Sequence, residues 1–149
     1  DSVCKYIDSG KAEGAKLLCG GTRPGGALAK GYYLTHAVFA DADTKMKIVQ
    51  EEIFGPVLAV LPFKDEEEAV RLANDSPYGL SGSLWTRDVG RVRRVTRAVQ
   101  TGVISVNTST SVHLEAPFGG YKTSGLGREL GLKSLDLYSE VKNVFISSL

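Results

Sequence analysis

The sequence predicts an α/β fold in which helices flank a parallel β-sheet. Segments with the 3.6-residue apolar period of amphipathic helices alternate along the chain with short apolar runs, which are typical of buried strands. The order strand–helix–strand occurs twice, and parallel strands joined by a helix connect through right-handed crossovers. Hydrophobic residues make up 42% of the 149 residues and charged residues 23%, which is ordinary for a globular domain.

In the first half of the chain, apolar residues at helical spacing predict a helix over residues 2–13. A short apolar run follows at residues 16–19, and a glycine-rich loop occupies residues 20–31. Aromatic and β-branched residues that alternate predict a strand over residues 32–39. Residues 57–61 are apolar without interruption, so we expect a strand that is covered on both faces.

In the second half, Asp65 and Glu68 have the spacing of a capping box, which predicts the start of a helix. A strand is expected over residues 80–86. Asp88 then begins a helix with a valine stripe, and the apolar residues 103–106 predict another buried strand.

The last part of the chain is less regular. Residues 107–128 show little periodicity, and loops of this length are usually functional or disordered. A short helix near residues 132–137 precedes a strand expected over residues 141–146, where apolar residues lie on both faces.

Charge and composition exclude several classes of protein. The formal net charge is only +1, whereas disordered chains combine high net charge with low hydrophobicity. No run reaches the roughly 18 apolar residues of a membrane-spanning helix, so we expect no membrane partner. The two cysteines are too few for a disulfide framework, which makes a reducing cytoplasm the expected location.

No group of side chains has the spacing of a metal site or an activated nucleophile. His36 and His113 are isolated, so we expect no metal. No His or Arg lies near Cys4 or Cys19 in sequence to lower the pKa of the thiol, and we interpret both as structural, buried thiols. The arginines of residues 91–97 share a helix with the valine stripe, which favours a solvated helix face over a nucleic-acid site.

Two segments point to a functional site. Residues 51–56, Glu-Glu-Ile-Phe-Gly-Pro, place two carboxylates and an aromatic ring directly before a buried strand, where the ring is well suited to line a pocket. Residues 116–129 combine aromatic residues with glycines after the strand at 103–106. α/β proteins place their ligand sites at such carboxyl ends of parallel strands.

In this order and spacing, the segments resemble the NAD(P)-dependent aldehyde dehydrogenase superfamily. The resemblance covers essentially the whole chain and implies an α/β fold of the catalytic-domain type. Its motifs are Glu-Glu-Ile-Phe-Gly-Pro-Val at 51–57, Asn74 with Gly79 and Leu80, Gly-Val-Ile-Ser-Val-Asn at 102–107, Pro-Phe-Gly-Gly-Tyr-Lys-Thr-Ser-Gly at 117–125, Gly-Arg-Glu-Leu-Gly at 127–131 and Glu-Val-Lys at 140–142.

Such enzymes are about three times longer than this chain, which is similar to their C-terminal third only. The resemblance therefore implies that the catalytic cysteine, the general-base glutamate, the oxyanion asparagine and the main cofactor-binding sheet all precede Asp1. Neither Cys4 nor Cys19 matches the nucleophile motif. Because the chain also starts without methionine, we expect a fragment that has no catalytic residue of its own and is inactive alone.

The resemblance also assigns cofactor-binding residues. In the family mechanism a cysteine thiolate adds to the aldehyde, hydride passes to nicotinamide, and water activated by glutamate hydrolyses the thioester. Glu52 matches the glutamate that accepts hydrogen bonds from the nicotinamide ribose. Phe54 matches the aromatic residue beside the nicotinamide, and Leu80 an aliphatic residue near it.

Other residues match positions of the substrate tunnel. Phe118 matches its inner aromatic wall, and Thr110 and Val112 match variable positions that tune substrate choice. Many relatives carry an aromatic residue in this loop, so the smaller Val112 favours a wider tunnel or a bulkier substrate. Glu129 matches a glutamate proposed for proton relay.

The resemblance implies two parts: residues 1–139 as the C-terminal portion of the catalytic domain and residues 140–149 as a terminal oligomerisation strand. The full-length enzyme would be a homodimer or homotetramer that oxidises an aldehyde to a carboxylic acid with NAD or NADP. Two alternatives stay open. One is a semialdehyde or betaine-aldehyde dehydrogenase, and the other is a non-catalytic oligomerisation or regulatory module.

Overall fold

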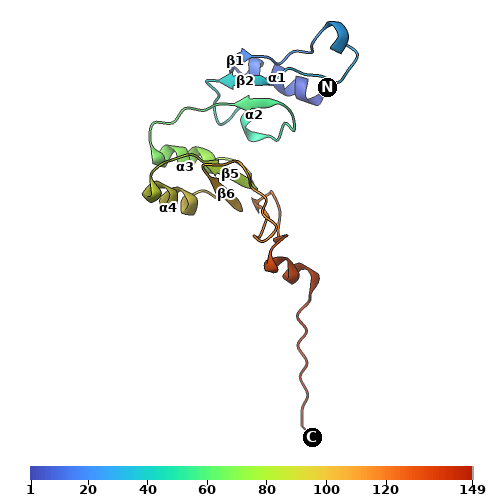
Figure 1. Cartoon of the computed structure of the whole chain (residues 1–149), viewed down its shortest axis with the longest axis vertical. Helices are drawn as coiled ribbons and strands as arrows, with labels where there is room; N and C mark the ends of the chain where they lie inside the picture. Colours follow the sequence, from blue (N-terminus) through green and yellow to red (C-terminus); the bar gives the residue numbers. More distant parts are fainter. Residues whose placement is uncertain (149) are drawn as a thin grey trace. The chain divides into compact units, whose positions relative to one another are not determined.

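The computed structural model describes residues 1–148. The chain divides into two compact units, Asp1–Asp75 and Ser76–Leu149, and each unit contains its own sheet structure. Figure 1 shows the elements in chain order, from blue at the N-terminus to red at the C-terminus.

The first unit is built on a mixed three-stranded sheet in the order β1-β2-β3. β1 pairs antiparallel with β2, and β2 pairs parallel with β3, so the predicted parallel pairing holds for one of the two pairs. The elements of this unit are α1 (Ser2–Ala12), β1 (Lys16–Cys19), the short 3₁₀ helix η1 (Gly26–Leu28), β2 (Ala37–Ala40), α2 (Lys47–Gln50), β3 (Val57–Ala59) and α3 (Glu66–Asn74).

The core of the first unit joins both early helices to the central strand. Ile7 of α1 and Phe39 of β2 are almost completely buried, and Ile48 of α2 packs with them. Burying each such side chain contributes about 1.5–3 kcal/mol. The end of α2, and with it the start of the segment at residues 51–56, is therefore fixed to the sheet.

Of the two predicted strand–helix–strand repeats, only the second forms a parallel pair among the described residues, and it lies in the second unit. The strands of the first repeat, at residues 57–61 and 80–86, belong to different sheets. β5 and β6 pair in parallel, with Ser81 opposite Val103, and α4 connects them. A separate antiparallel pair, β4 with β7, brings residues 78 and 122 together. The elements are β4 (Tyr78–Gly79), β5 (Ser81–Leu84), α4 (Val89–Ala98), β6 (Val103–Val106), β7 (Tyr121–Lys122) and the 3₁₀ helix η2 (Leu132–Tyr138).

The helix starts follow the predicted caps. The Asp65 side chain accepts a hydrogen bond from the backbone N–H of Glu68 at 2.8 Å. The Glu68 carboxylate reaches back to the N–H of Lys64 rather than of Asp65, at 2.9 Å. This hydrogen bond, helped by the Arg71 guanidinium, lowers the pKa of Glu68. Asp88 caps α4 in the same way.

Several predicted strands are wrong in extent. Of residues 32–39 only the end is a strand; Tyr32 is fully exposed, and Thr35 pairs locally with Thr22 instead of with the sheet. The strand predicted over residues 80–86 is shorter, and β4 precedes it. β3 is not covered on both faces by the described residues, since Leu58 is 57% exposed.

The C-terminal predictions also need correction. The helix near residues 132–137 is a 3₁₀ helix, η2. Residues 141–146 form no strand, because a strand needs a second backbone to pair with, and no segment of residues 1–148 pairs with them. The side chains of Val141 and Phe145 are 101% and 86% exposed. Leu149, the last residue of the predicted oligomerisation strand, lies outside the described residues.

Among residues 1–148, none of the helices combines the length and the apolar character needed to cross a membrane.

Candidate functional site

The segment at residues 51–56, called loop 51–56 below, is anchored to the first unit at several points. Glu51 directly follows α2, and its carboxylate accepts a hydrogen bond from the Tyr6 hydroxyl at 2.8 Å. Ile53 packs against the core. At the far end, the Pro56 carbonyl accepts a hydrogen bond from the N–H of Ala37 at 2.8 Å. The loop is therefore held at its start, middle and end.

The two side chains that the fold leaves free in this loop are Glu52 and Phe54. Glu52 is exposed and forms no hydrogen bond or ion pair with any described residue. Phe54 is 89% exposed, and its backbone has φ 52°, in the left-handed region. That conformation costs a residue with a Cβ about 1–2 kcal/mol. The fold thus holds an aromatic ring in solvent at an energetic cost, as functional sites do.

Gly55 lets the loop approach α1 closely. A Cβ at this position would lie 2.6 Å from Cγ2 of Val3, well inside van der Waals contact. Valine is stiff at χ1 and could not easily turn away. A glycine is therefore required for the loop to lie against α1 at this point.

A hollow of about 370 Å³ lies beside Phe54, as the sequence predicts for this aromatic residue. This volume is within the usual range of ligand pockets. The hollow belongs entirely to the first unit, and its walls include Phe54, Gly55, Pro56, Tyr33, Leu34 and Cys4.

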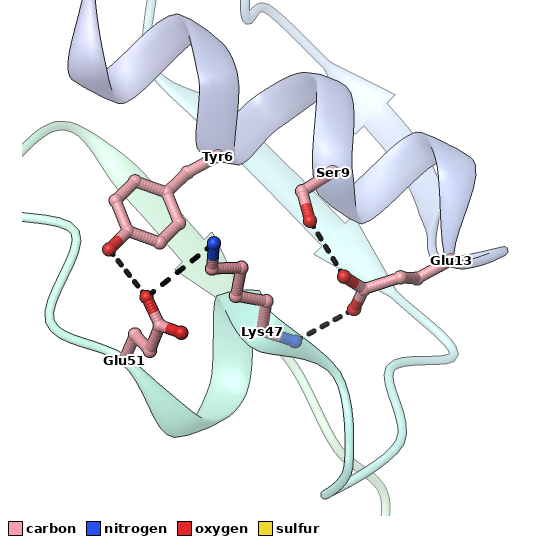
Figure 2. A network of polar contacts seen from close by, with 5 residues as sticks. All are labelled: Tyr6, Ser9, Glu13, Lys47 and Glu51. Atoms are coloured by element: carbon pink, nitrogen blue, oxygen red, sulfur yellow. Dashed lines mark hydrogen bonds and ion pairs between the residues drawn. The ribbon is translucent and has the colours of Figure 1, made fainter.

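A network of polar contacts connects α1 with both ends of α2 (Figure 2). Lys47 Nζ lies 3.9 Å from the Glu51 carboxylate and 5.7 Å from the centre of the Tyr6 ring. At the other end, the Glu13 carboxylate accepts hydrogen bonds from the Ser9 hydroxyl at 2.6 Å and the Lys47 N–H at 2.7 Å. Glu13 thereby caps α2, whose own N-cap residue provides no side-chain hydrogen bond.

These two hydrogen bonds, the Ser9 hydroxyl first and then the Lys47 N–H, lower the pKa of Glu13. Sequence reasoning missed the network. Its long-range contacts join residues 34 and 45 positions apart, and no local pattern marks them.

In the second unit, Asn107 extends the pairing of β5 and β6 with its side chain. Its Oδ1 accepts a hydrogen bond from the Thr86 N–H at 2.9 Å, and its Nδ2 donates to the Thr86 carbonyl at 3.0 Å. Its φ of 57° turns the chain away from β6, a conformation that asparagine tolerates. The Ser105 hydroxyl then donates to the Thr110 carbonyl at 2.6 Å, which folds the following loop back over the strand.

The glycines of the second unit bring three motifs together. The Gly102 N–H donates to the Gly79 carbonyl at 3.0 Å, and a Cβ at Gly102 would overlap the carbonyl of Gly119. Phe118 and Glu129 pair through their backbones, with N–H to carbonyl distances of 2.7 and 2.8 Å. Sequence reasoning gave these two residues separate roles, and the structure places them side by side.

Arg128 holds the glycine-rich turn that contains Phe118. Its Nη1 donates to the carbonyls of Gly120 and Gly127 at 3.0 and 2.7 Å, and its guanidinium lies 5.5 Å from the centre of the Tyr121 ring. We did not predict this role. The sequence did indicate it, because an arginine directly follows Gly-Leu-Gly. Backbone carbonyls in such a turn need a hydrogen-bond donor, which the guanidinium provides.

The other predicted site residues of the second unit line no described hollow. Leu80 follows β4 and is 42% exposed, and Val112 is 53% exposed. Thr110 and the Glu129 side chain are exposed, whereas Phe118 is half-buried. Glu52 and Phe54 thus share one loop of the first unit, and the predicted substrate residues belong to the second.

No group of His, Cys, Asp and Glu side chains within residues 1–148 has the arrangement of a metal site. Both cysteines are free thiols, and neither forms a hydrogen bond with a described residue. Cys4 is half-buried, but Cys19 is exposed, so its interpretation as a buried thiol is wrong.

The two free side chains of loop 51–56 offer a ligand two kinds of contact. An ionised carboxylate accepts hydrogen bonds only, so Glu52 matches a ligand with hydroxyl donors such as a diol. An exposed aromatic ring offers a face to a flat ring or an apolar group. Both are held by a rigid support, which is what orientation of a ligand requires.

Comparison with known proteins identifies the family of the chain. The aldehyde dehydrogenase family matches residues 1–144. A chloroplastic betaine aldehyde dehydrogenase of Atriplex hortensis is 46% identical over 144 residues, which are 97% of this chain and 28% of the relative.

Two solved structures are also similar. Betaine aldehyde dehydrogenase from Staphylococcus aureus in complex with NAD+ has a TM-score of 0.88 at 44% identity, over 92% of this chain and 27% of that one. An aldehyde dehydrogenase from Mycobacterium tuberculosis complexed with NAD+ has a TM-score of 0.88 at 47% identity, over 93% and 28%. The chain therefore spans less than a third of the length of these relatives.

Proposed function

Because the chain belongs to the aldehyde dehydrogenase family, we propose that it is part of an oxidoreductase that converts an aldehyde to a carboxylic acid. The proposed oxidant is NAD or NADP, and the relatives solved with NAD+ favour NAD. The observation that carries the proposal is loop 51–56, which is anchored along its length and leaves Glu52 and Phe54 free.

In this proposal Glu52 and Phe54 hold the nicotinamide half of the cofactor, which accepts a hydride when bound. The Glu52 carboxylate has no protein partner among the described residues and can accept hydrogen bonds from both ribose hydroxyls. The Phe54 ring covers an adjacent face and excludes water there. Leu80, in the second unit, is proposed as an aliphatic cofactor contact from the family resemblance alone.

The substrate side is proposed to include Thr110, Val112 and Phe118, with Glu129 as a proton relay. Support for Glu129 comes from its backbone pairing with Phe118, which keeps it next to the aromatic wall. A trimethylammonium substrate such as betaine aldehyde needs aromatic faces for cation–π contacts. Phe118 is one such face, and the betaine aldehyde dehydrogenases among the relatives make this aldehyde the first substrate to test.

The substitution Glu52→Gln in the full-length protein tests the cofactor role. Loss of charge-assisted hydrogen bonds worth about 1.5–3 kcal/mol should slow hydride transfer roughly tenfold or more. Thiol attack on the aldehyde should continue, because Glu52 does not act on it. Pre-steady-state formation of reduced cofactor measures the step.

Glu67→Gln is the matched control, since Glu67 is also an exposed glutamate of the first unit without a described partner. It should leave hydride transfer unchanged. An unchanged rate in Glu52→Gln would exclude the proposed role.

We further propose that residues 140–149 pair with a neighbouring subunit of a cytoplasmic homodimer or homotetramer. The exposed apolar side chains of residues 141–146 support this, because unpaired backbone and apolar surface favour association with another chain. The free thiols fit a reducing compartment. Light scattering on the full-length protein with and without residues 141–149 should show a lower oligomer after truncation, and an unchanged molar mass would contradict the assignment.

A further inference from the structure

The start of loop 51–56 is held by a side chain from another element. The Tyr6 hydroxyl of α1 donates a hydrogen bond to Oε2 of Glu51 at 2.8 Å, and Lys47 Nζ approaches the same oxygen (Figure 2). One helical turn earlier on α1, Val3 touches Gly55 near the end of the loop. Residues three apart lie on one face of a helix, so a single face of α1 contacts both ends of the loop.

The backbone conformation of Glu51 relates the direction of its side chain to that of the next residue. Glu51 has φ −112° and ψ 150°, which is extended backbone. Successive side chains of an extended segment point to opposite sides. Extended backbone at Glu51, with its side chain held toward Tyr6, favours the opposite side for the side chain of Glu52, which is exposed and has no described partner.

We propose that Tyr6 is a positioning residue for the cofactor: by holding Glu51, it fixes the direction of the Glu52 carboxylate and the placement of Phe54. Tyr6 itself does not touch the cofactor in this arrangement. The inference rests on the proposed function of Glu52 and deepens it.

Tyr6→Phe in the full-length protein removes the hydroxyl and keeps the half-buried ring. Loss of one hydrogen bond to a charged acceptor should weaken NAD binding by about threefold to tenfold. Binding of ADP should not change, because ADP lacks the nicotinamide ribose that Glu52 is proposed to hold. A merely structural role of Tyr6 would affect both ligands equally or neither.

A second readout does not depend on activity or on NAD. Amide hydrogen exchange at Ile53 and Phe54 should become faster in Tyr6→Phe, because the loop loses its anchor at Glu51. Ser9→Ala is the matched control: Ser9 lies on the same helix and in the same network, but its hydroxyl donates to Glu13 and not to Glu51. This control should leave exchange in the loop and NAD binding at wild-type values.

The outcomes separate this inference from the proposed function. If Glu52→Gln weakens NAD binding while Tyr6→Phe changes neither NAD binding nor loop exchange, the positioning role is wrong and the function stands. If the wild-type protein neither binds NAD nor oxidises an aldehyde, the function is wrong. Even if the proposed function is wrong, an unchanged rate of amide hydrogen exchange at Ile53 and Phe54 in Tyr6→Phe overturns the positioning role.

Discussion

At the scale of single residues, Phe54 combines exposure with an unfavourable backbone conformation. Phe54→Gly should relieve about 1–2 kcal/mol of left-handed strain, while the extra freedom of glycine in the unfolded chain costs about 0.5–1 kcal/mol. Little buried area is lost, since the ring is 89% exposed. We therefore expect the free energy of unfolding of the chain to stay equal or rise by up to about 1 kcal/mol, measured with urea.

Phe63→Gly is the control for this prediction. Phe63 is also exposed, at 62%, but its φ is not positive, so glycine relieves no strain there. This variant should be less stable than wild type. If Phe54→Gly were destabilised as much as Phe63→Gly, strain at residue 54 would be excluded.

Glu13 gives a prediction about pH. Its pKa lies below the ordinary value of 4.5 because the folded state provides hydrogen bonds to the carboxylate, first from Ser9 and then from Lys47. A lowered pKa means that Glu13 stabilises the fold above pH 4.5 and that this contribution is lost as the pH falls through the folded-state value. Glu13→Gln should thus be less stable than wild type at pH 7, and the difference should shrink in acid.

Urea unfolding of both proteins over a pH series measures this difference. A Glu13→Gln difference that grows on acidification would contradict the assigned hydrogen bonds.

At the scale of elements, the contact between Gly102 and Gly119 decides how closely the Phe118 turn lies to the start of β6. Gly102→Ala places a Cβ against the Gly119 carbonyl, and such overpacking typically costs about 1–3 kcal/mol. We expect a corresponding loss in the free energy of unfolding. A shift in the NMR signals of Phe118 should accompany it.

Gly82→Ala in β5 is the matched control. A Cβ at Gly82 meets no atom closer than 3.8 Å, so alanine should be neutral or slightly stabilising. If the two alanine variants had equal free energies of unfolding, the backbone near residue 102 would be able to shift away from Gly119 without loss of stability.

The helices and the parallel pair of β5 with β6 were predictable from the sequence because their signals are local. Asp65 and Asp88 cap their helices as the spacing of acceptor and N–H requires. The strand over residues 32–39 was predicted too long, because alternation of aromatic residues does not show whether a neighbouring strand is present. The pairing of Tyr6 with Glu51 depends on tertiary packing and left no trace in the sequence.

The candidate site was predictable to a similar degree. The sequence predicted that Phe54 lines a pocket, and the structure places its exposed ring at the edge of a surface hollow. The conformation of Phe54 and the support of the Phe118 turn by Arg128 were not predicted, since both arise from the path of the backbone rather than from residue type. The cofactor and substrate roles of all the candidate residues stay predictions: Glu52, Phe54, Leu80, Thr110, Val112, Phe118 and Glu129.

At the scale of the whole molecule, the chain contains proposed binding residues, and residues 1–148 show no hydrogen bond that would activate either cysteine as a nucleophile. Neither Cys4 nor Cys19 hydrogen-bonds to a base among the described residues, and Cys19 lies on a strand far in sequence from loop 51–56. We expect the isolated chain to show no aldehyde-dependent reduction of NAD. Absorbance of the reduced cofactor measures this, with the full-length protein as the positive control; turnover by the pure 149-residue chain would refute the expectation.

The strained phenylalanine of loop 51–56 also bears on natural selection. A residue that gains little from folding and strains its own backbone is retained only while its function is under selection. In a lineage that had lost cofactor binding, drift toward glycine or asparagine at position 54 would carry no penalty, because both residues adopt this conformation readily. The strain at position 54 is thus a feature that only a function of the exposed ring would preserve.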